Sequence, residues 1–537
     1  MRKNKLIPLF VILFLLFVVG WPMRSQATPV VEDGSDIRKA LSGPQAKSWA
    51  LQNVAKLQSF YQGRAYRKAW TPVLVTTLVT AINASTTHGL TPCDYRVTLL
   101  QDNKIDELHR ELLATDAYLT LAGHLFGGKV NPVSIEPGWN AAGRKNDLVV
   151  YLERALERGD IQESLEALAP SYPEYEELRR ALARYRQIAG QGGWGQIDSG
   201  KLLKPGSRGE RVIQLRERLK AGGDLEAESD ADQAEFTPAV EEAVKRFQKR
   251  VNLEPDGMLG PNTLRNLNRT PEDRIASLRI NLERWRWLPE DLGVRHIRVN
   301  IAGFFLDAYD HGSLARQHKV IVGMDYRQTP VFSGAIEYLI LNPWWYAPRK
   351  LAAKDKLPMF RKDPGYFAKG GFQLLDKAGK RVDERTVQWE RLSENNFPYQ
   401  LRQMPGPKNA LGRVKFIFPN SYNVYLHDTP SIELFAKVQR VFSSGCIRVE
   451  NPLELAEWLL ANQEGWNRDR IQQVVDSGRE TRVNLAVPMP VHLLYWTVLS
   501  DRENGDVRFI DDQYQRDPRI LKALDTMCPA GQAAGGR

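Results

Sequence analysis

Cysteine is scarce in this sequence, since 537 residues contain only Cys93, Cys446 and Cys528. A set of three cannot pair completely, so at least one thiol stays unpaired within the chain. If Cys446 is that thiol, Cys93 and Cys528 either form a disulfide or remain buried free thiols, and we favour free thiols. The scarcity therefore directs attention to Cys446 as a reactive group.

Other features are absent as well. No group of His, Cys, Asp and Glu has the spacing of metal ligands, and His88 and His124 lack such partners, so we expect no metal and no other cofactor. The sequence lacks arginine–aromatic RNA motifs and basic helix-turn-helix patterns, so its net charge of +10 does not indicate nucleic acid binding. That charge indicates either general solubility or attraction to an anionic polymer or membrane surface.

Long hydrophobic runs are absent except near the N-terminus. Basic residues there precede an apolar stretch from Leu6 to Gly20, and Ser25-Gln26-Ala27 has the small residues of a cleavage site. This order is typical of a secretory signal peptide, because the apolar stretch is shorter than the roughly 20 residues of a membrane span. We expect residues 1–27 to be removed, with an uncleaved inner-membrane anchor as the alternative. Either way, the mature chain would work outside the cytoplasm.

The chain is too long for a single hydrophobic core and divides by pattern into several domains. Apolar residues recur at helical spacing from about 46 to 195, which predicts an all-α scaffold domain within residues 28–198. We expect residues 28–45 to form a flexible lead-in and the last helices to cover 145–158 and 161–187. Nothing in this part has a catalytic pattern.

Residues 199–269 are predicted to form a compact second domain. Helices expected at 208–220 and 237–250 share an apolar face, and Asp256-Gly257 and Gly260-Pro261 provide turns before a third helix. The shared face consists of Val212, Leu215, Leu219, Val240, Val244 and Phe247. This pattern resembles the three-helix peptidoglycan-binding domain found beside many cell-wall enzymes. Its residues serve packing and turns, so they indicate the fold more strongly than sugar or peptide binding.

Residues 270–500 change to β character after a helix at 274–287. Short strands with turn residues between them are expected at 297–301, 304–309, 318–323, 335–343, 415–420, 424–427, 483–487 and 491–496. A charged insertion at 344–405 is long enough to be a lid over the site. The segment 501–537 is expected to be partly disordered. The predicted fold class is multidomain α+β, with a β-rich, sandwich or barrel-like catalytic domain.

The chemistry concentrates in Ser443-Ser444-Gly445-Cys446-Ile447-Arg448, with His427 lying 19 residues before Cys446. A thiol attacks as its thiolate, so we expect a depressed pKa for Cys446, and a nearby His can take its proton. Gly445 lets backbone N–H groups approach a developing oxyanion. Arg448 shares a strand face with Cys446 and can bind a carboxylate. The set indicates acyl transfer through a thioester.

The segment from Leu411 to Arg448 is similar to the YkuD-type L,D-transpeptidases, whose pattern is a His followed by Ser/Thr-His/Ser-Gly-Cys, an apolar residue and Arg. Most members have His where this sequence has Ser444. Some long periplasmic members also have Ser at that position. The resemblance extends to 329–332, 342–345 and 405–412, and with the other two domains it covers nearly the whole mature chain.

The resemblance implies that Cys446 is the nucleophile, His427 the base, and Gly445 and Cys446 the donors of an oxyanion hole. It also implies Arg448, Tyr425 and Trp345 as substrate contacts. Such enzymes cleave a donor stem peptide after meso-diaminopimelate, release D-alanine, and pass the acyl group to another diaminopimelate amine as a 3→3 cross-link. The implied partners are peptidoglycan stem peptides and glycan, cell-wall synthases and carboxypeptidases, and carbapenem-type β-lactams that acylate Cys446. We expect a periplasmic monomer.

Three outcomes share the first half-reaction, so the sequence leaves the acyl acceptor open. A diaminopimelate amine gives cross-linking, water gives carboxypeptidase or cross-link hydrolase activity, and a lysine amine attaches a lipoprotein to the wall. The long insertion favours an amine, because excluding water suppresses hydrolysis. A non-catalytic wall-binding scaffold is the alternative of another class.

Overall fold

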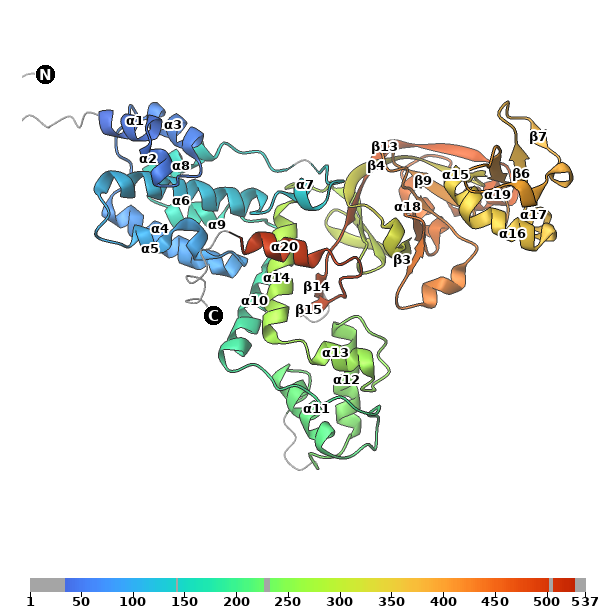
Figure 1. The fold of residues 1–537 in the computed structure, drawn as a ribbon, viewed down its shortest axis with the longest axis horizontal. Helices are drawn as coiled ribbons and strands as arrows, with labels where there is room; N and C mark the ends of the chain where they lie inside the picture. The colour runs from blue at the N-terminus through green and yellow to red at the C-terminus, as the bar shows by residue number, and fades with distance from the viewer. Residues whose placement is uncertain (1–33, 142, 227–231, 502–505, 527–537) are drawn as a thin grey trace, which may run out of the picture.

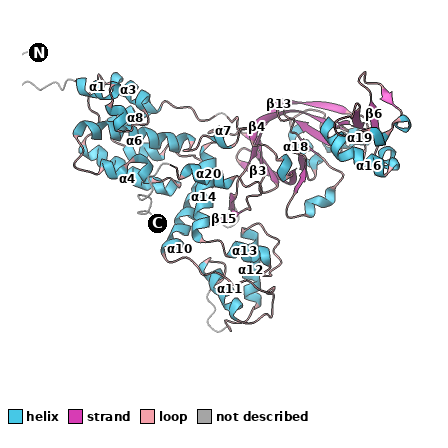
Figure 2. Cartoon of the chain, viewed as in Figure 1, coloured by secondary structure: helices cyan, strands magenta, loops and turns pink. Residues whose placement is uncertain are grey.

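A computed structural model describes residues 34–141, 143–226, 232–501 and 506–526. Figure 1 shows three lobes that meet at a central pair of helices, α10 (Pro173–Gly190) and α14 (Pro271–Arg286). Helices make up the N-terminal lobe and the small lower lobe, whereas strands dominate the third (Figure 2). The predicted multidomain α+β class is confirmed.

The N-terminal lobe is built around α6, whose Leu112, Tyr118 and Leu119 are completely buried. Asp116 on α6 accepts hydrogen bonds from the backbone N–H groups of Gln52 and Asn53 and so fixes the start of α3. The helices are α1 (Ser35–Ser42), α2 (Gln45–Ser48), α3 (Val54–Gly63), α4 (Pro72–Ala84), α5 (Val97–Leu100), α6 (Glu107–Gly127), α7 (Pro132–Ile135), α8 (Leu148–Arg158) and α9 (Ile161–Glu166).

Two expectations for this lobe were wrong. The predicted flexible lead-in at 28–45 contains α1, because Ile37, Ala40 and Leu41 present an apolar face that packs into the lobe. The single helix predicted at 161–187 is divided into α9 and α10, because Pro173 is favourable only as the first residue of a new helix.

The lower lobe, which we call the three-helix lobe, contains α11 (Glu210–Ala221), α12 (Pro238–Arg250) and α13 (Pro261–Leu267). The six apolar residues of the predicted shared face are all completely buried. Gln248 holds the turn that follows α12, since its amide group donates to Asp256 Oδ1 at 2.7 Å and accepts from the Gly257 N–H at 2.9 Å. Gly257 has a φ of +73°, which explains why glycine occupies this turn.

The third lobe, which we call the β lobe, has a sheet ordered β11-β3-β12-β10-β9-β4-β13-β1-β2. Because β2 also pairs with β3, the sheet closes on itself and β11 is added beside β3. This arrangement agrees with the barrel-like expectation. The strands are β1 (Arg295–Asn300), β2 (Phe305–Asp310), β3 (Ser313–Gly323), β4 (Phe332–Leu341), β9 (Val414–Ile417), β10 (Leu426–His427), β11 (Val441–Ser443), β12 (Ile447–Val449) and β13 (Thr481–Leu494), with helices α18 (Pro452–Leu460) and α19 (Arg468–Asp476).

The insertion between β4 and β9 forms a small unit with its own core around Phe360, Leu374 and Phe397. Its strands form a separate sheet ordered β5-β8-β6-β7. The elements are β5 (Trp345–Tyr346), α15 (Arg349–Leu351), α16 (Leu357–Lys362), α17 (Pro364–Lys369), β6 (Phe372–Leu375), β7 (Arg381–Val382) and β8 (Gln400–Gln403).

The C-terminal segment is folded over its described residues, whereas the tail after Cys528, which the sequence predicts to be disordered, lies outside them. It forms β14 (Val498–Asp501), β15 (Asp506–Phe509) and α20 (Asp517–Leu524), and α20 packs against α14. Apolar residues of both strands join the core formed by α10 and α14. Asp517 is fixed there by an ion pair of 2.7 Å to Arg284.

Cys93 is disulfide-bonded, so the expectation that it stays a free thiol is wrong, whereas Cys446 is free. Cys528 and the predicted signal peptide, residues 1–27, lie outside the described residues. Within the described part of the chain, every helix is too short or too polar to cross a membrane.

Candidate active site

Cys446 lies in the tight connection between β11 and β12, two short strands that both pair with β3. Gly445 precedes it with a φ of +114°, a conformation that side chains of L-residues rarely adopt. A Cβ at Gly445 would lie 3.7 Å from the Arg327 carbonyl oxygen, so space is available and the backbone angle is what requires glycine. This angle turns the chain so that Cys446 is only half-buried.

The predicted site residues lie on one face of the parallel pair β10–β12. His427 is the register partner of Arg448, and Leu426 is the partner of Ile447. Leu426 and Ile447 point into the core, so alternation places Tyr425, His427, Cys446 and Arg448 on the opposite face. The fold therefore brings together four of the residues that the sequence pattern nominated.

The thiol of Cys446 contacts Tyr425 and the backbone carbonyl of Asn423, with the sulfur 3.7 Å from that oxygen. Burial raises the pKa of the Cys446 thiol, and the hydrogen bonds with Tyr425 and the charge of Arg448 oppose this shift without reversing it. The expected depressed pKa is therefore wrong for this state. The protonated thiol is the resting form, and a base must remove its proton during reaction.

His427 is buried, and its Nδ1 lies 2.5 Å from the backbone oxygen of Asp428. A carbonyl only accepts, so Nδ1 carries the proton and Nε2 is the free acceptor. Burial and the nearby charges of Arg448 and Lys415 lower the pKa of His427 to about 3, which keeps the ring neutral. The described residues show no hydrogen bond between His427 and Cys446; the His427 ring instead contacts Tyr425 at 5.6 Å between centroids.

Arg448 extends from the same face and is half-buried. Among the described residues, its guanidinium makes no hydrogen bond and no ion pair, and burial lowers its pKa while Cys446 and Glu433 act in the opposite direction. A partly desolvated guanidinium with free donors is suited to a carboxylate.

The oxyanion-hole prediction needs one correction. The Gly445 N–H donates to Ser443 Oγ at 3.1 Å, and that hydroxyl donates to the Cys446 backbone oxygen at 2.5 Å. The Gly445 amide is therefore occupied in this state. The Cys446 amide makes no hydrogen bond within the described structure and remains available.

The sequence analysis missed the segment that holds this loop. Three consecutive loop residues are each bound by residues 324–329, which follow β3. The Met324 N–H donates to the Ser443 oxygen at 3.0 Å, and Arg327 donates to Ser444 Oγ at 2.9 Å. Thr329, which is completely buried, donates to the Gly445 oxygen at 2.9 Å. Residues 329–332 were noted as part of a resemblance, but no periodic pattern revealed these contacts.

Arg327 also connects the loop to the insertion. Its guanidinium forms an ion pair with Asp355, with Nη1 2.9 Å and Nη2 3.3 Å from the two carboxylate oxygens. Tyr425 packs against both the β-lobe core and the insertion core. Trp345 differs from its predicted role, because it is 7% exposed and buried in the core of the insertion.

Comparison with known proteins identifies the β lobe. Residues 294–483 match the YkuD family, described as "L,D-transpeptidase catalytic domain". The chain carries an L,D-transpeptidase catalytic domain. Residues 208–267, in the three-helix lobe, match a "Putative peptidoglycan binding domain", and residues 55–182 match a "Scaffold domain". The family resemblance drawn from the sequence is thus confirmed for all three parts.

The "Putative L,D-transpeptidase" of Haemophilus influenzae is 38% identical over 243 residues, which are 45% of this chain and 48% of that protein. The chain thus spans about half the length of this curated relative. An L,D-transpeptidase structure from Xylanimonas cellulosilytica is 15% identical, covers 55% of this chain and 99% of its own, and has a TM-score of 0.19. One from Stackebrandtia nassauensis is 14% identical, covers 56% and 96%, and has a TM-score of 0.21.

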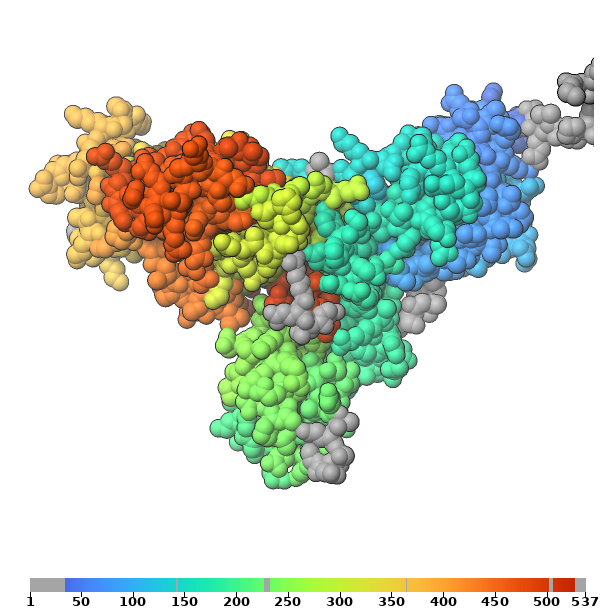
Figure 3. Space-filling view, turned by 180° about the vertical axis from the view of Figure 1, so that it is seen from behind, coloured from blue at the N-terminus to red at the C-terminus, as the bar shows by residue number. Residues whose placement is uncertain are grey.

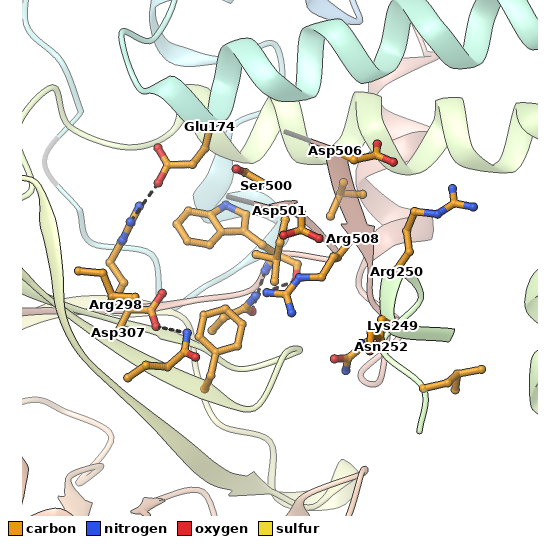
Figure 4. A pocket seen from close by; sticks show the side chains of 18 of the residues that line it. Glu174, Lys249, Arg250, Asn252, Arg298, Asp307, Ser500, Asp501, Asp506 and Arg508 are labelled. Carbon is orange, nitrogen blue, oxygen red and sulfur yellow. Dashed lines mark hydrogen bonds and ion pairs between the residues drawn. The ribbon is translucent and has the colours of Figure 1, made fainter. Parts of the chain in front are cut away.

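A cavity of about 1030 Å³ lies away from the thiol, between the three-helix lobe, the β lobe and the central helices α10 and α14 (Figure 4). Two ion pairs of its lining join α10 to neighbouring elements. Arg298 of β1 pairs with Glu174 of α10 at 3.0 Å, and Arg184 of α10 pairs with Asp506 of β15 at 3.0 Å. These ion pairs therefore hold together the elements that surround the cavity. Among the described residues, no group of His, Cys, Asp and Glu could hold a metal ion.

Proposed function

We propose that this protein is a peptidoglycan L,D-transpeptidase that forms 3→3 cross-links through a Cys446 acyl-enzyme. The observation that carries the proposal is the shared face of Tyr425, His427, Cys446 and Arg448, within a domain of this family. The match to a peptidoglycan-binding domain supports a substrate in the cell wall, and enzymes that act on the cell wall work outside the cytoplasm. We place the mature chain in the periplasm as a monomer.

In the first step, His427 Nε2 takes the Cys446 proton as the sulfur attacks the donor peptide carbonyl carbon. The neutral ring that burial enforces is the form that can accept this proton. The carbonyl oxygen becomes an oxyanion, which the free Cys446 N–H stabilises. As the C–N bond to D-alanine breaks, the imidazolium returns the proton to the leaving amine, and a thioester remains.

In the second step, the side-chain amine of an acceptor diaminopimelate attacks the thioester carbon. Neutral His427 takes the amine proton and returns it to the departing thiolate, so Cys446 ends as a thiol. Arg448 binds a substrate carboxylate throughout, because its free donors lie beside the thiol. The same nucleophile would be acylated by carbapenem-type β-lactams.

The acceptor distinguishes cross-linking from hydrolysis and from lipoprotein attachment. The contact from Asp355 through Arg327 to Ser444 ties the insertion to the thiol loop, and an insertion that excluded water there would favour an amine acceptor. A non-catalytic wall-binding scaffold is the alternative of another class, and the intact Cys446, His427 and Arg448 set argues against it.

The test compares the mature chain with its Cys446→Ala variant on disaccharide-tetrapeptides, using intact-protein and product mass spectrometry. We expect a thioester adduct, released D-alanine and 3→3 dimers only with the parent chain. Tripeptide monomers without dimers would establish hydrolysis instead. Equal products from both proteins would rule out Cys446 as the nucleophile.

A further inference from the structure

A groove of about 540 Å³ lies between the three-helix lobe and the β lobe, away from the thiol, and adjoins the cavity of Figure 4 at Asn252 and Leu253. One wall is the end of α12 with the turns around Asn252 and Asn262, and the other is the segment 437–442 before and within β11. In Figure 1 the orange ribbon of the β lobe extends toward the green three-helix lobe, and Figure 3 shows the two lobes beside each other from behind.

We propose that this junction groove binds a peptidoglycan glycan strand and thereby presents its stem peptides to Cys446. The inference rests on the proposed function, because that function supplies the polymer. It assigns a place on this chain at which the sugar backbone is held, formed by two domains together.

The lining of the groove has the chemistry of a sugar site. Val438 and Phe442 keep 40% and 38% of their surface exposed, so they offer apolar surface to a ligand in the groove. The amides of Asn252, Asn262 and Gln439 share the groove, and each can donate and accept hydrogen bonds. Apolar faces with a few amides suit the C–H faces, hydroxyls and acetamido groups of an amino sugar.

Charge argues against an anionic or cationic ligand. The groove contains acidic Glu254 and Asp256 as well as basic Lys437, so neither sign dominates. Asp511 at its edge is already paired, since Arg265 and Arg269 approach its carboxylate oxygens at 3.5 Å and 3.4 Å. A neutral, N-acetylated polymer fits this balance better than a phosphate polymer or a nucleic acid.

The same ion pairs join the two walls and extend the groove. Arg265 and Arg269 belong to the three-helix lobe and its exit, whereas Asp511 follows β15. A second cavity of about 440 Å³ shares Arg265, Asp511 and Gln439 with the groove, so the two adjoin each other. Adjoining cavities suit a chain of sugars better than a single small molecule.

The groove also lies close to the reaction centre along the chain. In β11 the side chains alternate, so Phe442 faces outward to the groove while Ser443 turns inward to hold the thiol loop. Phe442 precedes Cys446 by four residues, which is at most about 13 Å along an extended strand. A peptide branch from a strand in the groove can therefore span the separation to the sulfur.

The test uses the full chain with Cys446→Ala, so that binding is measured without turnover. Calorimetry would be run with peptide-free glycan strands released by an amidase, and separately with free stem tetrapeptide. Val438→Asp and Asn262→Trp change opposite walls of the groove. Val487→Asp is the matched control, because Val487 is 76% exposed on β13 and does not line the groove. All variants must melt at the same temperature as the parent.

We expect each groove variant to weaken glycan binding by about tenfold or more, equivalent to about 1.4 kcal/mol, while the control binds like the parent. Glycan binding that both groove variants retain, or no glycan binding by the parent, would overturn the proposal. Binding of free tetrapeptide that is lost only in the groove variants would replace the glycan with the peptide. Loss of the acyl adduct in the separate assay on the parent chain would refute the reaction without affecting these results.

Discussion

At the scale of single residues, the state of the Cys446 thiol follows from its surroundings. Burial raises the pKa of the thiol, while Tyr425 and Arg448 favour the thiolate. We therefore expect the rate of iodoacetamide alkylation to keep rising with pH and to reach no plateau below about pH 9. Tyr425→Phe removes a stabilising hydrogen bond and should slow alkylation at pH 8. A plateau near neutrality, or faster alkylation of the variant, would contradict this view.

The backbone angle at Gly445 makes a separate prediction. At a φ of +114° an alanine is strained although its Cβ has room, so Gly445→Ala should lower the free energy of unfolding by about 1–3 kcal/mol. Gly195→Ala is the control, because Gly195 has no positive φ and nothing lies within 4 Å of the added Cβ. Chemical denaturation of both variants measures the difference, and equal losses would show that the angle is not the cause.

The sequence could predict the chemical identities at this site but not all of their contacts. The period of two in short strands predicts that Cys446 and Arg448 share a face, and the structure agrees. The direction of the pKa shift of the thiol could not be predicted, because it depends on burial by residues far apart in sequence. Arg327 and Thr329 were missed for the same reason, since they act from a turn without any periodic pattern.

At the scale of elements, the insertion is tied to the thiol loop by one side chain. Arg327 binds Asp355 on one side and Ser444 on the other. We expect Asp355→Asn to raise KM for the donor peptide several-fold with a smaller change in kcat, because the ion pair positions the insertion rather than the reacting atoms. Steady-state kinetics on disaccharide-tetrapeptides checks this expectation.

A matched control lies within the insertion itself. Asp383 pairs with Arg385 at 3.0 Å, two residues away, and touches nothing near the thiol. Asp383→Asn should therefore leave KM unchanged. A similar rise in both variants would indicate a general loss of charge, and no rise in Asp355→Asn would mean that the insertion does not govern donor binding.

The insertion also shows where element prediction succeeds. The change to charged sequence after β4 was visible in the sequence, and the insertion has a separate sheet and core in the structure. The role of Trp345 was not predictable, because an aromatic residue beside a β strand packs inward or faces substrate depending on neighbours that only the folded insertion supplies.

At the scale of the whole molecule, the N-terminal lobe reaches the thiol loop through a buried ion pair. Glu136 pairs with Arg516 at 3.0 Å, with side chains only 10% and 12% exposed. Arg516 also donates to the Thr329 oxygen at 3.1 Å, and Thr329 holds Gly445. Glu136→Gln leaves a buried cation uncompensated, so the free energy of unfolding should fall by about 3–5 kcal/mol.

The measurement pairs chemical denaturation with thiol alkylation on the same variant. Glu457→Gln is the control, because its pair with Arg468 is exposed and 3.8 Å long, and such pairs contribute little. We expect Glu136→Gln to change the alkylation rate of Cys446 as well as stability. A loss of stability with an unaltered alkylation rate would limit the contact to a structural role.

The contacts that residues after Cys446 make with the segment behind it have a consequence for the order of folding during synthesis. Tyr514 binds the Gly323 oxygen at 2.5 Å, and Arg516 binds the Thr329 oxygen; both residues follow Cys446 in the chain. A nascent chain that has emerged past the nucleophile still lacks these supports. We therefore expect the thiol loop to reach its described arrangement only after synthesis has passed residue 516.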